Sequence, residues 1–145
     1  MKKYELTTEC KEFLGRKLYR IKSLIDFDSI KEGDLGGWIE KKENLSQEGN
    51  AWVCDNATVS GNAEIKKKTH LLEIGFIGSR DDVTTFFRTK DKGIFVKCGC
   101  FEGDIDDFEK KVQKVHADDK HGRVYALAIA MAKEQIELDK EAENE

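Results

Sequence analysis

The sequence predicts an α+β protein, with N-terminal strands and a single coil of hexapeptide-like β structure followed by a C-terminal β-β-β-α-α lobe. Three observations support this prediction. A six-residue repeat occupies residues 48–66, strand-like apolar runs lie between residues 71 and 101, and two segments with helical spacing of apolar residues follow. We expect two regions, residues 1–68 and 69–140, with residues 141–145 as a frayed, charged tail.

The composition is that of a folded protein with a polar exterior. Of the 145 residues, 39% are hydrophobic and 37% are charged, and two Trp and eight Phe help to fill a core. The net charge of -4 argues against binding along DNA, which a positive surface drives. No apolar run reaches the ~18 residues of a membrane-spanning helix, and the sequence begins without an apolar leader. We therefore expect a cytoplasmic protein with reduced cysteines.

The first region begins with a strand and a glycine-rich loop. Residues 17–22 alternate in the manner of a strand. Gly33, Gly36 and Gly37 follow, and they indicate turns or a close approach of two backbones.

Residues 48–66 contain three copies of the pattern [GD]-N-A-x-[VI] at a period of six. This period is typical of a triangular parallel β-helix, in which the aliphatic residue points inward and Asn tolerates the left-handed corners. The aliphatic positions are Val53, Val59 and Ile65. We therefore expect one coil of such a helix here.

A degenerate earlier coil is also expected, because Ile39 and Leu45 are six residues apart but out of phase with Val53. One or two coils bury little surface by themselves, so they must cap another element or pack on another subunit. The open ends of a truncated β-helix expose unpaired backbone, which favours a homo-oligomer. The run of Lys66, Lys67 and Lys68 marks the boundary between the regions.

Three strands are predicted next. They cover residues 71–77, 83–89 and 94–101, and the second and third form a hairpin around Asp91-Lys92-Gly93.

Two helices complete the predicted fold. Asp104 is a suitable N-cap, and the apolar stripe of the first helix consists of Ile105, Phe108, Val112 and Val115. The second helix begins near Gly122, and its predicted buried face contains Val124, Leu127, Ala128, Met131 and Ala132.

The stretch GDLGGWIEKKENLSQEGNAWVCDNATVSGNAEI (residues 33–65) resembles phage and prophage proteins that carry short hexapeptide-like repeats. Such proteins begin with a LYRIK-like strand, as at residues 18–22, and end with a segment like IGSRDDVTTFFRTKDKGIFVKCGCFEGDIDDF, residues 77–108 here. The resemblance covers roughly residues 16–130 and implies a phage context. Small phage proteins of this kind include immune-evasion proteins that sequester cyclic nucleotides or ADP-ribose derivatives, usually as oligomers.

A group of basic, aromatic and hydroxyl side chains is the candidate ligand site. Arginine and lysine neutralise phosphate, phenylalanine offers a stacking face for a base, and threonine supplies a short donor. The competing interpretation is that one of Phe86 and Phe87 is core and that the cations are solvated or paired with carboxylates. The candidate ligand-binding residues are Arg80, Thr84, Phe86, Arg88, Lys97 and Arg123.

The cysteines offer a weaker candidate. Cys98 and Cys100 form a C-x-C pair that, with Cys54 or His70, has the donors of a zinc site. However, both lie on one face of a predicted strand and a second ligand pair is missing, so we expect apolar packing and no metal.

The hexapeptide repeats suggest an acyltransferase, but such trimeric enzymes need several stacked coils and a histidine base. One coil is predicted and only His70 lies near it, so we interpret the repeats as structural. His116 and His121 are five residues apart, and His116 suits a helix C-terminus. We expect no catalytic residues and no cofactor.

We therefore expect a phage-encoded, non-enzymatic protein that sequesters a nucleotide-derived immune signal in the host cell cytoplasm. The alternative is a module whose acidic surface docks on and inhibits a host enzyme. A metal-dependent nucleotide hydrolase is the third hypothesis.

Overall fold

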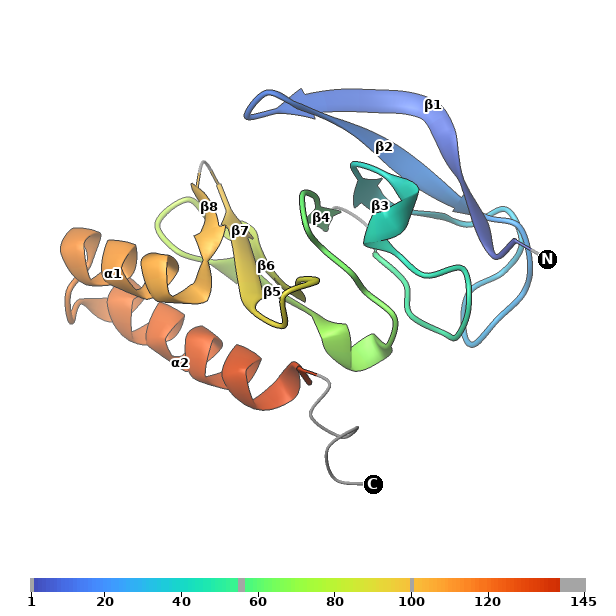
Figure 1. Cartoon of the computed structure of the whole chain (residues 1–145). Helices are drawn as coiled ribbons and strands as arrows, with labels where there is room; N and C mark the ends of the chain where they lie inside the picture. The colour runs from blue at the N-terminus through green and yellow to red at the C-terminus, as the bar shows by residue number, and fades with distance from the viewer. Residues whose placement is uncertain (1, 55–56, 100, 139–145) are drawn as a thin grey trace, which may run out of the picture.

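The computed structural model describes residues 2–54, 57–99 and 101–138. In this part of the chain, two four-stranded sheets and two C-terminal α-helices form a mixed α+β fold, as the sequence predicts (Figure 1). None of the helices in the described residues is long and apolar enough to cross a membrane.

The first sheet has the strand order β1-β2-β3-β4. Its strands are β1 (Tyr4–Phe13), β2 (Arg16–Ser23), β3 (Leu35–Ile39) and β4 (Thr58–Val59). Strand β2 confirms the strand predicted at residues 17–22, whereas β1 was not predicted. Most of β1 is exposed, and its pairing with β2 shifts between Leu6 and Cys10. Its sequence therefore lacks the regular alternation of apolar and polar residues by which a strand is predicted.

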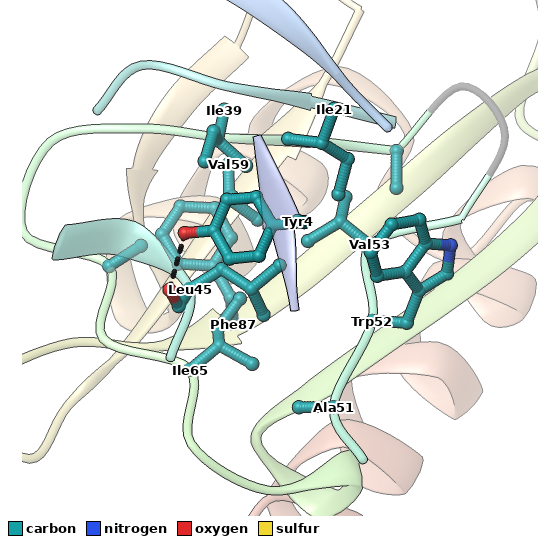
Figure 2. Close-up of a cluster of buried hydrophobic side chains, with 12 residues drawn as sticks. Tyr4, Ile21, Ile39, Leu45, Ala51, Trp52, Val53, Val59, Ile65 and Phe87 are labelled. Atoms are coloured by element: carbon teal, nitrogen blue, oxygen red, sulfur yellow. Dashed lines mark hydrogen bonds between the residues drawn. The ribbon is translucent and has the colours of Figure 1, made fainter. Parts of the chain in front are cut away.

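The repeat region confirms the predicted inward positions. Val53, Val59 and Ile65 are at most 1% exposed, and the alanines two positions before each of them are equally buried. Figure 2 shows these side chains packed with Tyr4, whose hydroxyl donates to the Leu45 carbonyl at 2.6 Å. Residues 55–56, which open the middle repeat, lie outside the described residues.

The expected earlier coil is present. Ile39 pairs in parallel with Val59, and Leu45 with Ile65, so both pairs are 20 residues apart in the chain. This separation is two residues longer than three six-residue repeats. The insertion lies between Leu45 and Val53, where the phase of the pattern breaks. A short 3-10 helix, η1 (Lys42–Asn44), lies just before Leu45.

The second sheet has the order β5-β6-β7-β8, and all its pairs are antiparallel. It follows η2 (Lys68–His70) and consists of β5 (Leu71–Ile77), β6 (Asp82–Arg88), β7 (Ile94–Cys98) and β8 (Phe101–Asp104). The single strand predicted at residues 94–101 was therefore wrong. Gly99 has a φ of 56°, which reverses the chain there and pairs Cys98 with Phe101.

Helix α1 (Ile105–Val115) begins at the predicted cap, because the Asp104 carboxylate accepts the N–H of Asp107 at 2.8 Å. Ile105, Phe108 and Val112 are buried as expected, whereas Val115 is 57% exposed.

Helix α2 (Lys120–Gln135) has Asp119 as its cap, and its buried face agrees with the predicted one only at Ala128 and Ala132. Leu127 and Met131 are 70% and 53% exposed. Apolar residues occupy both sides of this helix, so their spacing alone did not identify the inner face. The buried residues are Gly122, Tyr125, Ala128, Ile129 and Ala132.

Strand β6 joins the two cores. Phe86 is completely buried in the core beneath the helices, whereas Phe87 is buried in the core of the short β-helix. One face of the second sheet therefore covers the β-helix and the other carries α1 and α2. A backbone hydrogen bond also connects β6 to the last repeat, because the N–H of Glu64 donates to the Arg88 carbonyl at 3.0 Å.

Candidate functional site

A cavity of about 430 Å³ opens at the end of the second sheet, and we call it the helix–sheet pocket. The β5–β6 and β7–β8 turns, the C-terminal half of α1 and the start of α2 surround it. Its lining comprises Ser79, Arg80, Asp82, Cys98, Gly99, Phe101, Glu102, Phe108, Lys111, Val112, Val115, His116 and Tyr125.

Aromatic rings form a continuous wall of the pocket. The centroid of Phe108 lies 5.3 Å from that of Phe101 and 5.5 Å from that of Tyr125. The next ring, His116, lies 5.8 Å from Tyr125. The planes of Phe101 and Phe108 are tilted by 45° and those of Phe108 and Tyr125 by 86°, so the rings form an angled apolar lining against which an aromatic ligand can pack.

The charged groups of the pocket are unequally engaged. The Glu102 carboxylate lies 3.2 Å from Nε of Arg16 and accepts from the Ser60 hydroxyl at 3.3 Å. Asp82 accepts the N–H of Val83 at 2.8 Å. In residues 2–54, 57–99 and 101–138, no carboxylate lies within ion-pair distance of Arg80 or Lys111. These two cations are therefore the groups best placed to meet an anion.

The floor of the pocket is a small polar cluster. The Thr84 hydroxyl donates to Sγ of Cys98 at 3.2 Å, and that sulfur lies 3.6 Å from the Tyr125 hydroxyl. Burial, reinforced by Cys98, raises the pKa of Tyr125 above its usual range, so the phenol stays protonated. Glycine suits position 78, because its φ is 87° and a Cβ there would overlap the Tyr125 hydroxyl.

The predicted ligand residues do not gather in one place. Arg80 lines the pocket, and Thr84 lies beneath it. Phe86 is buried behind the aromatic wall, with its ring centroid 6.1 Å from that of Phe108. Lys97 extends instead toward the N-terminal hairpin, where its Nζ lies 3.7 Å from the centroid of Phe13.

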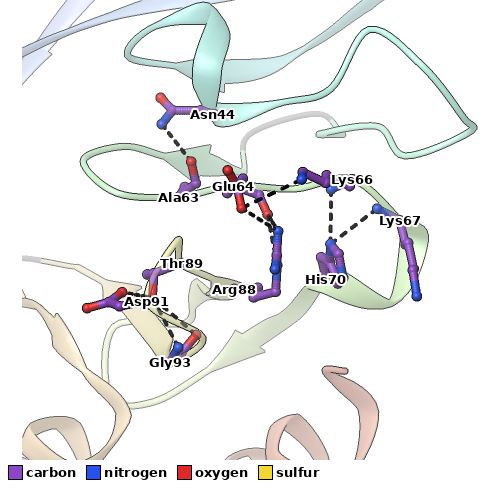
Figure 3. A network of polar contacts seen from close by, with 10 residues as sticks. All are labelled: Asn44, Ala63, Glu64, Lys66, Lys67, His70, Arg88, Thr89, Asp91 and Gly93. Atoms are coloured by element: carbon purple, nitrogen blue, oxygen red, sulfur yellow. Dashed lines mark hydrogen bonds and ion pairs between the residues drawn. The ribbon is translucent and has the colours of Figure 1, made fainter. Parts of the chain in front are cut away.

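Arg88 is completely buried at the junction with the last repeat (Figure 3). Its Nη2 donates to the backbone carbonyl of Glu64 at 2.7 Å and to the carboxylate of the same residue at 2.9 Å. Arg123 is exposed on α2, outside the pocket lining, and donates to the Asp118 carbonyl. Neither residue contributes a surface to the pocket.

The histidines and cysteines form no metal centre in the described residues, where no group of three or more His, Cys, Asp or Glu has a suitable arrangement. Cys100 lies outside the described residues. His70 is completely buried, and its Nδ1 accepts the N–H groups of Lys66 and Lys67 at 3.0 and 3.3 Å (Figure 3). His116 lies 3.5 Å from the Asp119 carboxylate.

Sequence reasoning missed Phe101, Phe108, Lys111 and Tyr125 as pocket residues. Phe108 was assigned to the apolar stripe of the first helix, and it packs in the core while also lining the cavity. The sequence did offer one signal for the pocket, namely a glycine in each of the two turns. Gly78 and Gly99 both adopt a positive φ, and their turns bring two strand ends beside the helices.

No protein-family model matches the chain. Among curated proteins, the chain is similar to the "Uncharacterized acetyltransferase YdcK" of Escherichia coli (strain K12), with 38% identity over an alignment of 80 positions. The aligned part covers 49% of this chain and 24% of that protein, so the chain spans about a quarter of the relative's length. This likeness fits the hexapeptide-like repeats.

Proposed function

We propose that this protein binds a small anionic ligand with an aromatic body in the helix–sheet pocket and does not transform it. The observation that carries the proposal is the aromatic wall of Phe101, Phe108 and Tyr125 beside two cations, Arg80 and Lys111, that lack carboxylate partners within the described residues. Rings of this kind favour a base or another flat group, and the cations favour phosphate.

A nucleotide-derived signal is the ligand class that matches these groups. The volume of about 430 Å³ lies within the ~300–1,000 Å³ typical of small-molecule pockets. Cyclic nucleotides and ADP-ribose derivatives combine a base with phosphate. The resemblance to phage proteins supports a role in which the protein sequesters such a signal in the host cytoplasm and so counters host defence.

Native mass spectrometry of protein purified from cells, followed by calorimetric titration with cyclic nucleotides and ADP-ribose derivatives, tests the proposal. We expect a retained mass of nucleotide size and saturable binding. Replacing both cations (Arg80→Ala with Lys111→Ala) should weaken binding by about 10- to 100-fold. The matched control is Lys110→Ala, which removes an exposed charge on α1 outside the pocket. A wild-type protein that retains no ligand and binds none of the panel contradicts the proposal.

Acetyl transfer is a second candidate function, suggested by the name of the E. coli relative. Hexapeptide-repeat acyltransferases use a histidine as the catalytic base, and the histidine next to the repeats in this chain is His70. Its Nδ1 already accepts two backbone N–H groups. Incubation with labelled acetyl-CoA and a panel of amine and hydroxyl acceptors tests this candidate. Turnover that survives His70→Gln would require another base.

A further inference from the structure

The outward face of α2 carries an ordered set of exposed side chains that the ligand pocket does not use. We call it the outer stripe of α2. At the helical spacing of 100° per residue these side chains share one face, opposite the buried one. From the start of the helix to its end the outer stripe consists of Lys120, Arg123, Leu127, Ala130, Met131 and Glu134, all exposed.

The charge order along the outer stripe opposes the helix dipole. Cations are stabilising near a helix C-terminus and anions near the N-terminus, yet here Lys120 and Arg123 lie at the start and Glu134 at the end. No acidic residue occupies the first turn of α2. Among the described residues, neither Arg123 nor Glu134 has an oppositely charged side chain within ion-pair distance. The helix dipole therefore does not account for the charge order of the outer stripe.

The same order is self-complementary when the helix is reversed. An antiparallel second copy brings its acidic end against the basic end of the first and its apolar middle against the apolar middle. A register that opposes Arg123 and Glu134 also opposes Leu127 and Ala130, and it places Met131 near the centre. In the antiparallel arrangement the dipoles of the two helices also point in opposite directions, which is favourable.

We propose that two copies of this protein associate through the outer stripe of α2, with the helices antiparallel about a two-fold axis near Leu127 and Ala130. Such an interface is isologous, so each ion pair between Arg123 and Glu134 occurs twice. The dimer leaves the helix–sheet pocket open, because Tyr125 faces the pocket from the opposite side of α2. The proposal is independent of the proposed ligand binding.

Sedimentation velocity measurements on the full chain test the proposal by charge reversal. Arg123→Glu alone places two acidic groups together at both ends of the interface, and Glu134→Arg alone places two cations together. Each should reduce the association constant about tenfold or more. The double variant R123E/E134R should associate within about threefold of the wild type, because it restores both pairs. An equimolar mixture of the two single variants should form a mixed dimer for the same reason.

The matched control is Lys110→Glu, which makes the same charge change at an exposed position of α1 and should leave association unchanged. A wild-type protein that remains monomeric at about 100 µM overturns the proposal, since even a weak dimer is detected at that concentration. Association that persists in both single variants, or that the double variant fails to restore, also overturns it. Circular dichroism of each variant separates loss of pairing from loss of folding.

Discussion

At the scale of single residues, the buried side chain of Arg88 fixes β6 to the last repeat. Its guanidinium donates to the backbone carbonyl of Glu64 from both Nε and Nη2, at 3.0 and 2.7 Å, and its own carbonyl accepts the Glu64 N–H. A residue chosen from the sequence as a phosphate ligand therefore has a structural role here. Its charge is neutralised within the fold.

Removing this guanidinium should destabilise the protein. We expect Arg88→Met to lower the free energy of unfolding by about 2–4 kcal/mol, because the Glu64 carbonyl loses its side-chain donors and the carboxylate loses its partner. Urea denaturation measures the change. The control Arg80→Met alters an exposed arginine and should change stability by less than about 0.5 kcal/mol. Equal effects of the two substitutions would contradict the assignment.

Lys3 gives the protein a distinctive pH dependence. Its buried Nζ donates to the carbonyl of Ala51 at 2.7 Å and to that of Gly49 at 3.3 Å. Burial lowers the pKa of Lys3 from 10.5 to about 8. Between these two values the unfolded chain binds more protons at this residue than the folded protein does, so stability rises with pH.

We therefore expect the free energy of unfolding to rise by about 1–2 kcal/mol from about pH 7.5 to about pH 9.5. Above about pH 10 the trend should reverse, because burial raises the pKa of Tyr4 and Tyr125, and unfolding then releases their protons. Denaturation curves across this range measure both effects. A Lys3→Met variant that keeps the whole rise would assign it to another group.

At the scale of elements, the sequence predicted correctly those strands and helix ends that depend on local sequence patterns. Strand β5 at residues 71–77 and the cap at Asp104 are where propensity and capping chemistry placed them. Strand β1 was missed and the inner face of α2 was predicted only in part, because tertiary contacts decide both. The division of residues 94–101 was missed because a single left-handed glycine, Gly99, outweighed a strand-like composition.

The candidate site was less predictable than the fold for the same reason. Arg80 was recognised because a charged residue after a strand end is visible locally. The aromatic wall combines Phe101 from β8, Phe108 from α1 and Tyr125 from α2, which meet only through tertiary packing. No sequence spacing links these three elements, so the pocket appears only once they are placed.

Strand β3 provides a test at this scale. A Cβ on Gly37 would lie 2.5 Å from the Ala57 carbonyl oxygen and 2.8 Å from Cγ1 of Val53. We expect Gly37→Ala to destabilise the protein by about 1–3 kcal/mol, because neither the backbone nor the buried Val53 has room to move. The control is Gly93→Ala, whose Cβ meets its nearest neighbour at 3.5 Å. Comparable thermal midpoints for the two variants would contradict the close approach at β3.

At the scale of the whole molecule, a very short β-helix is stabilised by a sheet that covers it. Two stacked coils bury little surface of their own, and Phe87, Leu71 and Phe95 of the second sheet complete their core. The helices cover the opposite face of the same sheet. We therefore expect that the repeats alone do not make a stable unit and that the two regions of the chain behave as one cooperative structure.

This dependence predicts a single unfolding transition. Trp38 and Trp52 lie in the first region and both α-helices in the second, so tryptophan fluorescence and helical circular dichroism report on different halves of the molecule. We expect the two signals to change at the same urea concentration. Phe87→Ala should lower the free energy of unfolding by about 3–5 kcal/mol, because the lost ring belongs to the core of the repeats. Both urea midpoints should fall together, because β6 connects that core to the second sheet. If the fluorescence transition moved alone while the helical signal stayed in place, the second sheet would be an independent domain and not the cover that the β-helix requires.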